Sequence, residues 1–332
     1  MNTWDTVVRI LPEKLQQVFR EIQPDMELLC EIRLRAGKPL LLQYGGKERC
    51  VIRKRPEELW QIQAMWKGKP EAEWAVYCVS EREVRDTLEA AGRYSLYAYE
   101  EELRQGFLTL RGGHRIGVAG RVIMESGQVR SMKQISFLNI RICHQVKGCG
   151  DPVMPYLYNA WGQVYHTLII SPPGCGKTTL LRDLIRQISD GNWGKYPGYT
   201  VGVVDERSEL AGACDRGTAN DVGIRTDVLD CCPKIEGMML LVRSMSPEVV
   251  AVDEIGRPEE IGAIETVIHS GCRFLATVHG NSLEDIAEKP LLKRLVQERV
   301  FQRYLVLRKR DIHSSIMENQ ILDEEGRQIC LW

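Results

Sequence analysis

A phosphate-binding loop between a buried strand and a helix constrains the fold of this chain more than any other feature. The string SPPGCGKTT, residues 171–179, follows the apolar run YHTLII and precedes a stretch of helical periodicity that reaches about residue 189. Backbone N–H groups can surround a phosphate chain only where glycines keep side chains away, and the start of a helix adds the positive end of its dipole. The loop therefore predicts an α/β nucleotide-binding domain.

The residue types in this loop predict ATP and Mg²⁺ as cofactors. Lys177 supplies a cation for the terminal phosphates, and Thr178 supplies a hydroxyl for Mg²⁺. One position departs from the usual eight-residue pattern, because Ser171 stands where the first glycine is expected. A chance Gly-Lys-Thr in a surface turn is the alternative, and the flanking strand and helix argue against it. The expected nucleotide-binding residues are Gly174, Cys175, Gly176, Lys177, Thr178 and Thr179.

Apolar runs and helical stretches alternate through the rest of the C-terminal half. Nearly continuous apolar strands are typical of a mostly parallel sheet that helices cover on both faces, as in RecA-like P-loop domains. Strands are expected at 165–170, 200–205, 248–253 and 273–278, and helices at 234–245 and 257–270 in addition to the one that follows the loop.

Three of these strands end in side chains that can support phosphoryl transfer. After VVAV we expect Asp253 to hold Mg²⁺ and Glu254 to act as the general base. After VGVVD, one of Glu206 and Glu209 is a candidate to position water or metal, although exposed charges at the start of a helix would look the same. His279 follows RFLATV and is a candidate to contact the γ-phosphate, although a lone histidine is more often structural.

The N-terminal half predicts a smaller α+β domain. Helices are expected at 3–22 and 80–105, the second with Ser80 and Glu83 as a capping box. Alternating polar and apolar residues at 31–52 predict a small antiparallel meander, and the pattern of strands returns at 107–142.

Glycine and proline cluster in VKGCGDPVMP, residues 146–155, which marks a boundary. We therefore expect an N-terminal domain at 1–147 and a P-loop ATPase domain at 148–332.

Charge and cysteine content narrow the class of protein. The net charge is −1, with +5 on residues 1–148 and −6 on residues 149–332, too weak a basic footprint to favour nucleic acid. Eleven cysteines without a C-x-x-C pair indicate reduced thiols of a cytoplasmic protein rather than disulfides or zinc. No run resembles a signal peptide or a membrane span, so we expect any membrane contact to come through a partner.

Arginines near the domain boundary are candidates to act on a neighbouring subunit's phosphates, although a solvated strand charge is the commoner role for each. They are Arg111, Arg115, Arg121, Arg130 and Arg141, with Arg225 and Arg243 in the C-terminal half.

The order of these motifs resembles that of the secretion (traffic) ATPases of type II and type IV systems and type IV pili. SPPGCGKTT, VVDERSE, RSMSPEVVAVDEIG and CRFLATVHGNS stand in the order of their Walker A motif, Asp box, Walker B motif and His box. Within that superfamily, EIRLRAGKP, GRYSLYAYEEELRQGFLTLRGGHRIGVAGRV and DVGIRTDVLDCCPKIEGM resemble the stage III sporulation AA family, so the likeness covers most of the chain.

Position by position, Lys177 and Thr178 match the Walker A residues, and Glu254 matches the Walker B glutamate. Either Glu206 or Glu209 matches the Asp-box acid, and His279 matches the His box. Many of those enzymes have glycine where this chain has Asp253.

The resemblance implies a Mg²⁺-dependent ATPase that forms a homo-hexameric ring, with the N-terminal domain over the nucleotide and arginines acting in trans. It also implies a place in the mother-cell cytoplasm during endospore formation, where membrane proteins of a channel to the forespore would recruit the ring. Hydrolysis would then drive assembly of that channel or transport through it.

Two other classes stay open. A nucleic-acid-translocating motor is disfavoured by the charge balance and by the absence of an R-x-x-x-H signature. A non-hydrolysing, nucleotide-dependent scaffold is compatible with Ser171, whereas Glu254 argues for hydrolysis.

Overall fold

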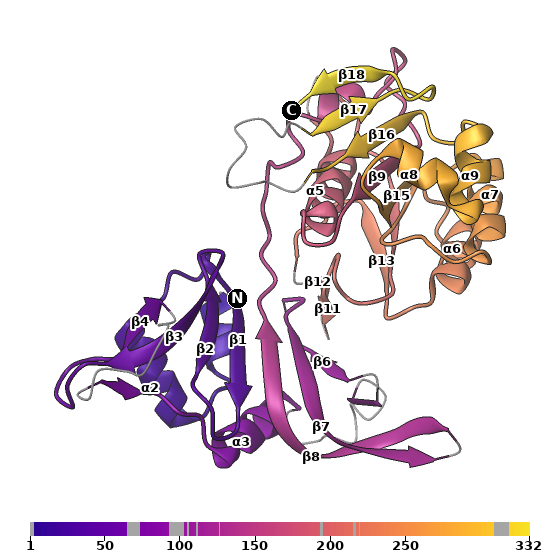
Figure 1. Ribbon diagram of the computed structural model, residues 1–332. Helices are drawn as coiled ribbons and strands as arrows, with labels where there is room; N and C mark the ends of the chain where they lie inside the picture. Colours follow the sequence, from indigo (N-terminus) through magenta and orange to yellow (C-terminus); the bar gives the residue numbers. More distant parts are fainter. Residues whose placement is uncertain are drawn as a thin grey trace. The chain divides into compact units, whose positions relative to one another are not determined.

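The chain forms two compact units, Met1–His144 and Gln145–Trp332, each with its own sheet (Figure 1). The computed structural model describes residues 3–64, 74–92, 103–104, 106–110, 112–125, 127–192, 195–214, 217–218, 220–308 and 319–332.

The first unit is an antiparallel sheet with helices packed on one face. Its strands are β1 (Leu29–Arg35), β2 (Leu41–Tyr44), β3 (Lys47–Arg53), β4 (Gln61–Ala64), β5 (Ala75–Val76), β6 (Phe107–Thr109), β7 (Arg115–Glu125) and β8 (Gln128–Arg141). They pair in the order β4-β3-β2-β1-β8-β7-β6, with β5 also on β3. Helices α1 (Thr3–Val8), α2 (Glu13–Ile22) and α3 (Glu81–Ala91) share one apolar core with this sheet. The antiparallel meander expected at 31–52 and the strands expected at 107–142 are therefore confirmed.

The helices of this unit are shorter than the sequence predicted. The helix expected at 3–22 is interrupted before Pro12, whose ring disfavours helical backbone at the preceding residue. The predicted capping box is present, because Ser80 Oγ accepts from the Glu83 N–H at 3.2 Å and Glu83 Oε2 accepts from the Ser80 N–H at 2.7 Å. The helix that begins there ends at Ala91, and most of its expected remainder, residues 93–102, lies outside the described ranges.

The second unit is an eight-stranded mixed sheet in the order β13-β10-β14-β15-β9-β16-β17-β18. The first six strands run parallel and the last two are antiparallel. The strands are β9 (Thr167–Ser171), β10 (Val201–Asp205), β13 (Thr226–Asp230), β14 (Val249–Val252), β15 (Arg273–His279), β16 (Arg303–Val306), β17 (Gln320–Leu322) and β18 (Gln328–Leu331). A separate short pair joins β11 (Ala213–Cys214) to β12 (Gly217–Thr218).

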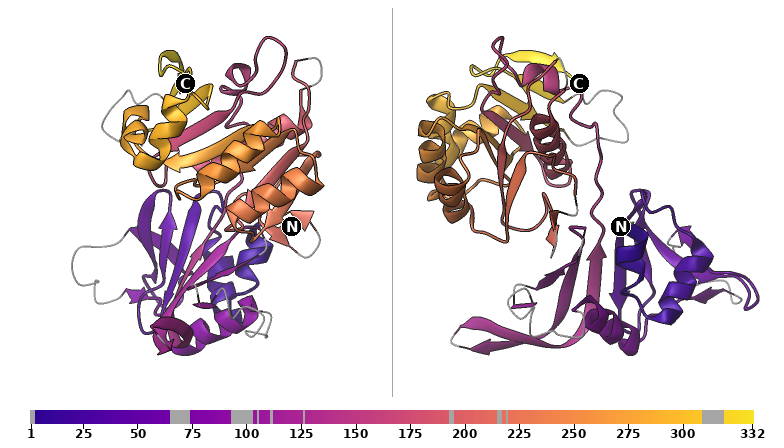
Figure 2. Two further views of the ribbon diagram at one scale, coloured as in Figure 1. Left: turned by 90° about the vertical axis from the view of Figure 1, so that its right-hand side faces the viewer. Right: turned by 180° about the vertical axis from the view of Figure 1, so that it is seen from behind.

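Helices cover both faces of the second sheet (Figure 2). They are α5 (Lys177–Asp190), α6 (Lys234–Ser244), α7 (Glu260–His269), α8 (Leu283–Glu288) and α9 (Pro290–Gln297), with a short 3-10 turn η2 (Met154–Tyr156). In the part of the chain that is described, none of the helices has the length and apolar character needed to cross a bilayer.

Alternate residues of each central strand face two different cores. In β9, Ile169 belongs to the core under α5, while Leu168 and Ile170 belong to the core under α6 to α9. Burial on both faces explains why these strands appear in the sequence as continuous apolar runs. The mostly parallel sheet predicted for this half is thus confirmed for its central strands.

The edges of this sheet were not predicted. Strand β13 lies inside what the sequence presents as a long polar stretch, and its residues TDVLD are only partly buried at the sheet edge. The antiparallel strands β17 and β18 close the opposite edge.

Alanine substitutions at two helical glycines are expected to change the stability of the protein in opposite directions. A Cβ at Gly237 of α6 would lie 2.5 Å from Val204 Cγ1 of β10, whereas a Cβ at Gly262 of α7 would meet none of the described atoms within 4 Å. Gly237→Ala should lower the free energy of unfolding by about 1–3 kcal/mol, because overpacking exceeds the gain in helix propensity. Gly262→Ala should raise it by about 0.5–1 kcal/mol. Urea denaturation of both variants measures the difference, and equal stabilities would contradict the close packing of α6 on β10.

Candidate functional site

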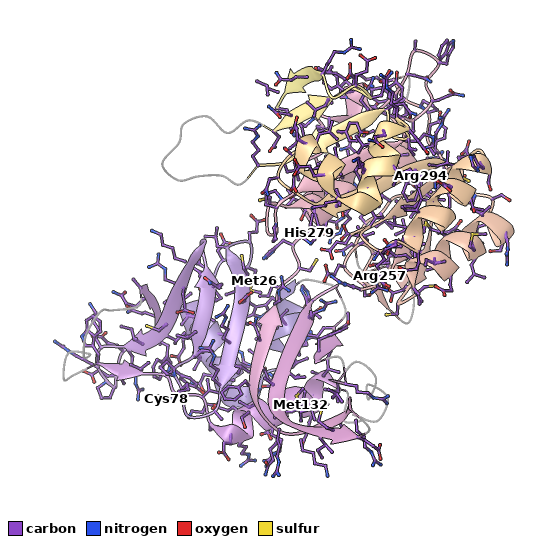
Figure 3. The ribbon with its side chains drawn as sticks, turned by 45° about the vertical axis from the view of Figure 1, so that its right-hand side comes forward. Met26, Cys78, Met132, Arg257, His279 and Arg294 are labelled. Carbon is purple, nitrogen blue, oxygen red and sulfur yellow. The ribbon has the colours of Figure 1, made fainter. Side chains whose placement is uncertain are left out.

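The candidate site lies where the parallel strands of the second unit end. Strands β9, β15, β14 and β10 pair in register, with Ser171 opposite His279 and Val204 opposite Val252. The segments that follow these strands therefore leave the sheet at one edge, which is where open α/β sheets bind ligands. Figure 3 shows His279 and Arg257 on this side of the second unit.

The phosphate loop has the backbone that its glycines predict. Gly174 has a φ of 75° and Gly176 a φ of 88°, so a side chain at either position would be strained. Gly176 precedes α5 without a side-chain cap, which leaves the helix N-terminus to an anion. Ser171, in place of the first glycine, is the last residue of β9 and has extended backbone that any residue can adopt. The serine is therefore compatible with a phosphate-binding loop.

Lys177, Arg207 and the imidazole of His279 contact the carboxylate of Glu254. Lys177 Nζ lies 2.8 Å and His279 Nε2 lies 3.1 Å from Oε1, while Arg207 Nη1 donates to Oε2 at 2.6 Å. Burial acts to raise the pKa of Glu254, but the hydrogen bond and charge of Lys177 and the charges of Arg207 and His279 outweigh it. The pKa is held below its usual value, so this carboxylate is ionised at neutral pH.

A threonine from β15 joins the two carboxylates that follow β14. Thr277 Oγ1 donates to Asp253 Oδ1 and accepts from the Glu254 N–H at 2.8 Å. Asp253 Oδ2 accepts from Thr178 Oγ1 at 2.7 Å. Thr178 and Asp253, the two residues predicted to hold Mg²⁺, thus lie side by side although 75 positions separate them. This hydroxyl and carboxylate fit a hard cation that takes oxygen ligands.

The acids that follow β10 have different surroundings. Asp205 is buried, and its carboxylate accepts the backbone N–H groups of Glu209, Leu210 and Ala211. Burial raises the pKa of Asp205 and these three N–H groups oppose the rise. We conclude that Asp205 stabilises the backbone of the segment that follows β10.

The two predicted acids, Glu206 and Glu209, line a cavity beside the Walker B residues. Glu206 Oε2 lies 2.8 Å from the buried Lys234, which also contacts Glu260 at 3.4 Å. The cavity measures about 10 Å³, roughly the room for one water molecule. It is lined by Asp205, Glu206, Arg207, Glu209, Lys234, Asp253 and Glu254.

Three residues of this site were missed by the sequence reasoning. Arg207 stands within the acidic string DERSE, and Thr277 stands two residues before His279 on the same strand. Both residues therefore belong to motifs that the sequence indicates. Lys234 gives no such signal, because its partners come from segments far apart in the chain.

The arginines proposed to act in trans have varied surroundings. Arg115 lies over the Phe107 ring at 4.2 Å, Arg130 pairs with Glu125 at 3.0 Å, and Arg121 is exposed. Arg141 is largely exposed, 3.8 Å from Glu31, and Arg111 lies outside the described ranges.

The other two candidate arginines are not brought to the strand ends. Arg225 donates to the carbonyls of Ser189 and Asp190, where α5 ends, and Arg243 is exposed in the last turn of α6.

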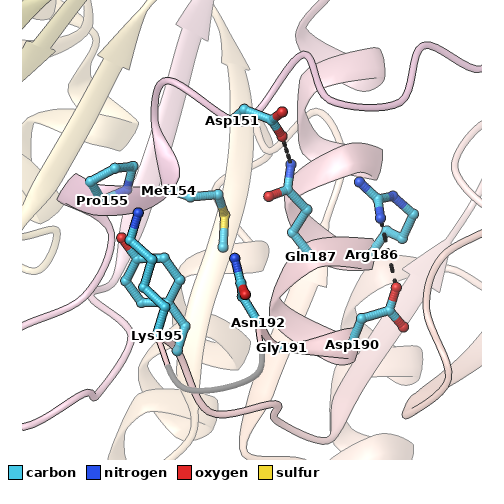
Figure 4. A pocket seen from close by; sticks show the side chains of 10 residues that line it. Asp151, Met154, Pro155, Arg186, Gln187, Asp190, Gly191, Asn192 and Lys195 are labelled. Atoms are coloured by element: carbon cyan, nitrogen blue, oxygen red, sulfur yellow. Dashed lines mark hydrogen bonds and ion pairs between the residues drawn. The ribbon is translucent and has the colours of Figure 1, made fainter.

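A larger cavity, about 540 Å³, lies at the opposite end of α5 (Figure 4). Several of its polar side chains contact one another: Gln187 donates to Asp151 at 2.8 Å, and Arg186 contacts Asp190 at 3.7 Å. The chemistry-bearing residues thus gather at the smaller cavity.

Comparison with known proteins identifies relatives over nearly the whole chain. The family model described as "Sporulation stage III, protein AA" matches residues 1–329. Stage III sporulation protein AA of Bacillus subtilis (strain 168) is 41% identical over 323 residues, which cover 96% of this chain and 95% of that protein.

Solved structures confirm the predicted α/β fold class. The X-ray structure of the ATPase DotB of Legionella pneumophila is similar with a TM-score of 0.53, at 12% identity, over 90% of this chain and 77% of that chain. The crystal structure of the pilus retraction motor PilT with bound ADP is similar with a TM-score of 0.50, at 17% identity, over 90% of this chain and 80% of that chain.

The ion pair between Lys177 and Glu254 predicts a measurable coupling energy in the absence of nucleotide. Lys177→Met, Glu254→Gln and the double variant should show a coupling of about 1–2 kcal/mol at pH 7, measured by urea unfolding. Because the pKa of Glu254 is lowered, the coupling is present in full above 4.5, the ordinary value, and is lost as the pH falls through the folded-state pKa.

The exposed pair Lys147–Asp221, 2.5 Å apart with side chains 57% and 44% exposed, is the matched control. The same cycle with Lys147→Met and Asp221→Asn should give at most about 0.5 kcal/mol. Equal coupling in the two pairs would contradict the burial of the Lys177–Glu254 pair.

Proposed function

The chain belongs to the family of sporulation stage III protein AA, and from this membership we propose that it is a Mg²⁺-dependent ATPase of the secretion-ATPase superfamily. Its hydrolysis of ATP drives assembly of, or transport through, a channel between mother cell and forespore during endospore formation. It acts in the mother-cell cytoplasm, where membrane proteins of that channel recruit it.

One observation carries the proposal: Lys177 and Thr178 from the phosphate loop contact Glu254 and Asp253 at the end of β14. A strand-loop-helix motif alone supports nucleotide binding. Carboxylates directly against its lysine and threonine add a metal-holding group and a proton acceptor, which hydrolysis requires.

We assign roles to this chain's residues from that arrangement. Gly174, Cys175, Gly176 and Thr179 present backbone around the phosphates at the start of α5, and Lys177 reaches the terminal ones. Thr178 and Asp253 would hold Mg²⁺, which would supply positive charge to the phosphates. Lys177 then exchanges its contact with Glu254 for one with phosphate, which leaves Glu254 to accept a proton from water.

Supporting roles fall to residues around the small cavity. Glu206 and Glu209 line it beside Glu254, so either carboxylate could position the water, and glutamine variants of each decide between them. His279 lies at the same carboxylate and serves as the γ-phosphate contact.

A homo-hexameric ring completes the proposal. The two compact units are its domains, with a boundary close to residues 144–148. Arg111, Arg115, Arg121, Arg130 or Arg141 of one subunit supplies positive charge to a neighbour's phosphates. The opposite net charges of the two halves, +5 and −6, favour contact between unlike halves of two subunits.

Steady-state ATP hydrolysis over a protein concentration series tests this function. Turnover per subunit of the wild type should rise with concentration, because the in-trans arginine is present only in the assembly. Glu254→Gln should lower kcat by about 10²–10⁴-fold, since the proton acceptor is gone. Its Kd for a fluorescent ADP analogue should stay within about threefold.

Glu259→Gln is the matched control, because Glu259 is exposed five positions away at the start of α7. It makes the same change in charge and should hydrolyse ATP like the wild type. A wild type that binds ADP but never turns ATP over, alone or with channel proteins, would make a nucleotide-dependent scaffold the better function. Salt-dependent retention on single-stranded DNA would instead favour the nucleic-acid motor.

A further inference from the structure

Arg207 contacts the candidate site, but none of the sequence motifs assigns it a role. It lies in the segment after β10, its guanidinium donates to Glu254 Oε2 at 2.6 Å, and its side chain is 54% exposed. The two residues are 47 positions apart. A group that orients a general base is usually hydrogen-bonded to that base. Arg207 is bonded in this way to Glu254, the proposed general base.

The two oxygens of Glu254 have different neighbours. Oε1 faces Lys177 at 2.8 Å and His279 at 3.1 Å, whereas Oε2 faces Arg207. A lysine in this loop reaches the terminal phosphates when nucleotide is present. Oε1 is therefore the oxygen nearest the reacting phosphate, and Oε2 is the oxygen that stays bonded to Arg207.

Both partners are held by their backbone. The segment that carries Arg207 is fixed by the buried Asp205, which accepts the N–H groups of Glu209, Leu210 and Ala211. Glu254 has a φ of 56°, uncommon for a residue with a side chain, and its N–H is bonded to Thr277 Oγ1. The direction of the carboxylate is thus set from two sides.

We propose that Arg207 is a positioning residue that holds the Glu254 carboxylate through Oε2 and directs Oε1 to the attacking water; the inference rests on the proposed function. Oε1 takes one proton from the water as its oxygen bonds to the γ-phosphorus. The bond from that phosphorus to the β–γ bridging oxygen breaks, and its electron pair leaves with ADP. The proton then passes from Glu254 to solvent.

Arg207→Ala and Arg207→Lys test this role through kcat, KM and binding. We expect Arg207→Ala to lower kcat by about 10–100-fold through loss of orientation. The Kd values for ADP and for a non-hydrolysable ATP analogue should stay within about twofold. Arg207→Lys should recover part of kcat, because it keeps a cation but not the fork of donors.

The dependence of kcat on pH separates positioning from a structural role, because a loss of stability alone does not shift this pH profile. The acidic limb of kcat should shift to higher pH in Arg207→Ala, because the guanidinium that bonds the Glu254 carboxylate, and helps to lower its pKa, is removed. The other charged groups around the cavity are Asp205, Glu206, Glu209, Lys234 and Asp253.

Arg327→Ala is the control, because Arg327 is 70% exposed and also bonded to a carboxylate, Asp323, at 3.0 Å. It should leave kcat and the pH profile unchanged. Weaker binding of the ATP analogue but not of ADP in Arg207→Ala would overturn the inference, because Arg207 would then contact the γ-phosphate. An unchanged kcat would also overturn it. A wild type without turnover overturns the proposed function itself, and with it this role.

Discussion

The parallel pairing of four strands is the constraint on which the site depends. Strands β10, β14, β15 and β9 are hydrogen-bonded neighbours in register, so the segments that follow them start at one edge of the sheet. Each strand is buried between α5 on one face and α6 to α9 on the other. Apolar packing on both faces fixes the positions of these strands. The sheet therefore holds the backbone of the polar residues at the strand ends in place.

Electrostatics at that edge are arranged around the ion pair of Lys177 and Glu254. Lys177 is buried, and without a phosphate its nearest anion is Glu254. An ammonium in such a place is costly unless it is paired, so the carboxylate stabilises the loop until an anionic ligand takes its place. The same carboxylate thus belongs to the resting structure and to the proposed chemistry.

Sequence patterns predicted the parts of this structure that depend on local or periodic signals. Continuous apolar runs identified β9, β10, β14 and β15, and the glycines identified the loop before Lys177. Strand β13 escaped because an edge strand needs only one neighbour and can be half polar. The contacts of Arg207 and Lys234 escaped for another reason: they join segments 47 and 28 positions apart, and only the folded sheet brings these together.

Thr277 has a consequence for how this site can vary. Its hydroxyl is bonded both to the Asp253 carboxylate and to the Glu254 N–H, so one side chain on β15 fixes two residues that follow β14. Valine has nearly the same shape but neither bond, and serine keeps both bonds without the methyl group. Positions 253, 254 and 277 are therefore coupled, because a hydroxyl side chain at position 277 is needed to keep both of these bonds.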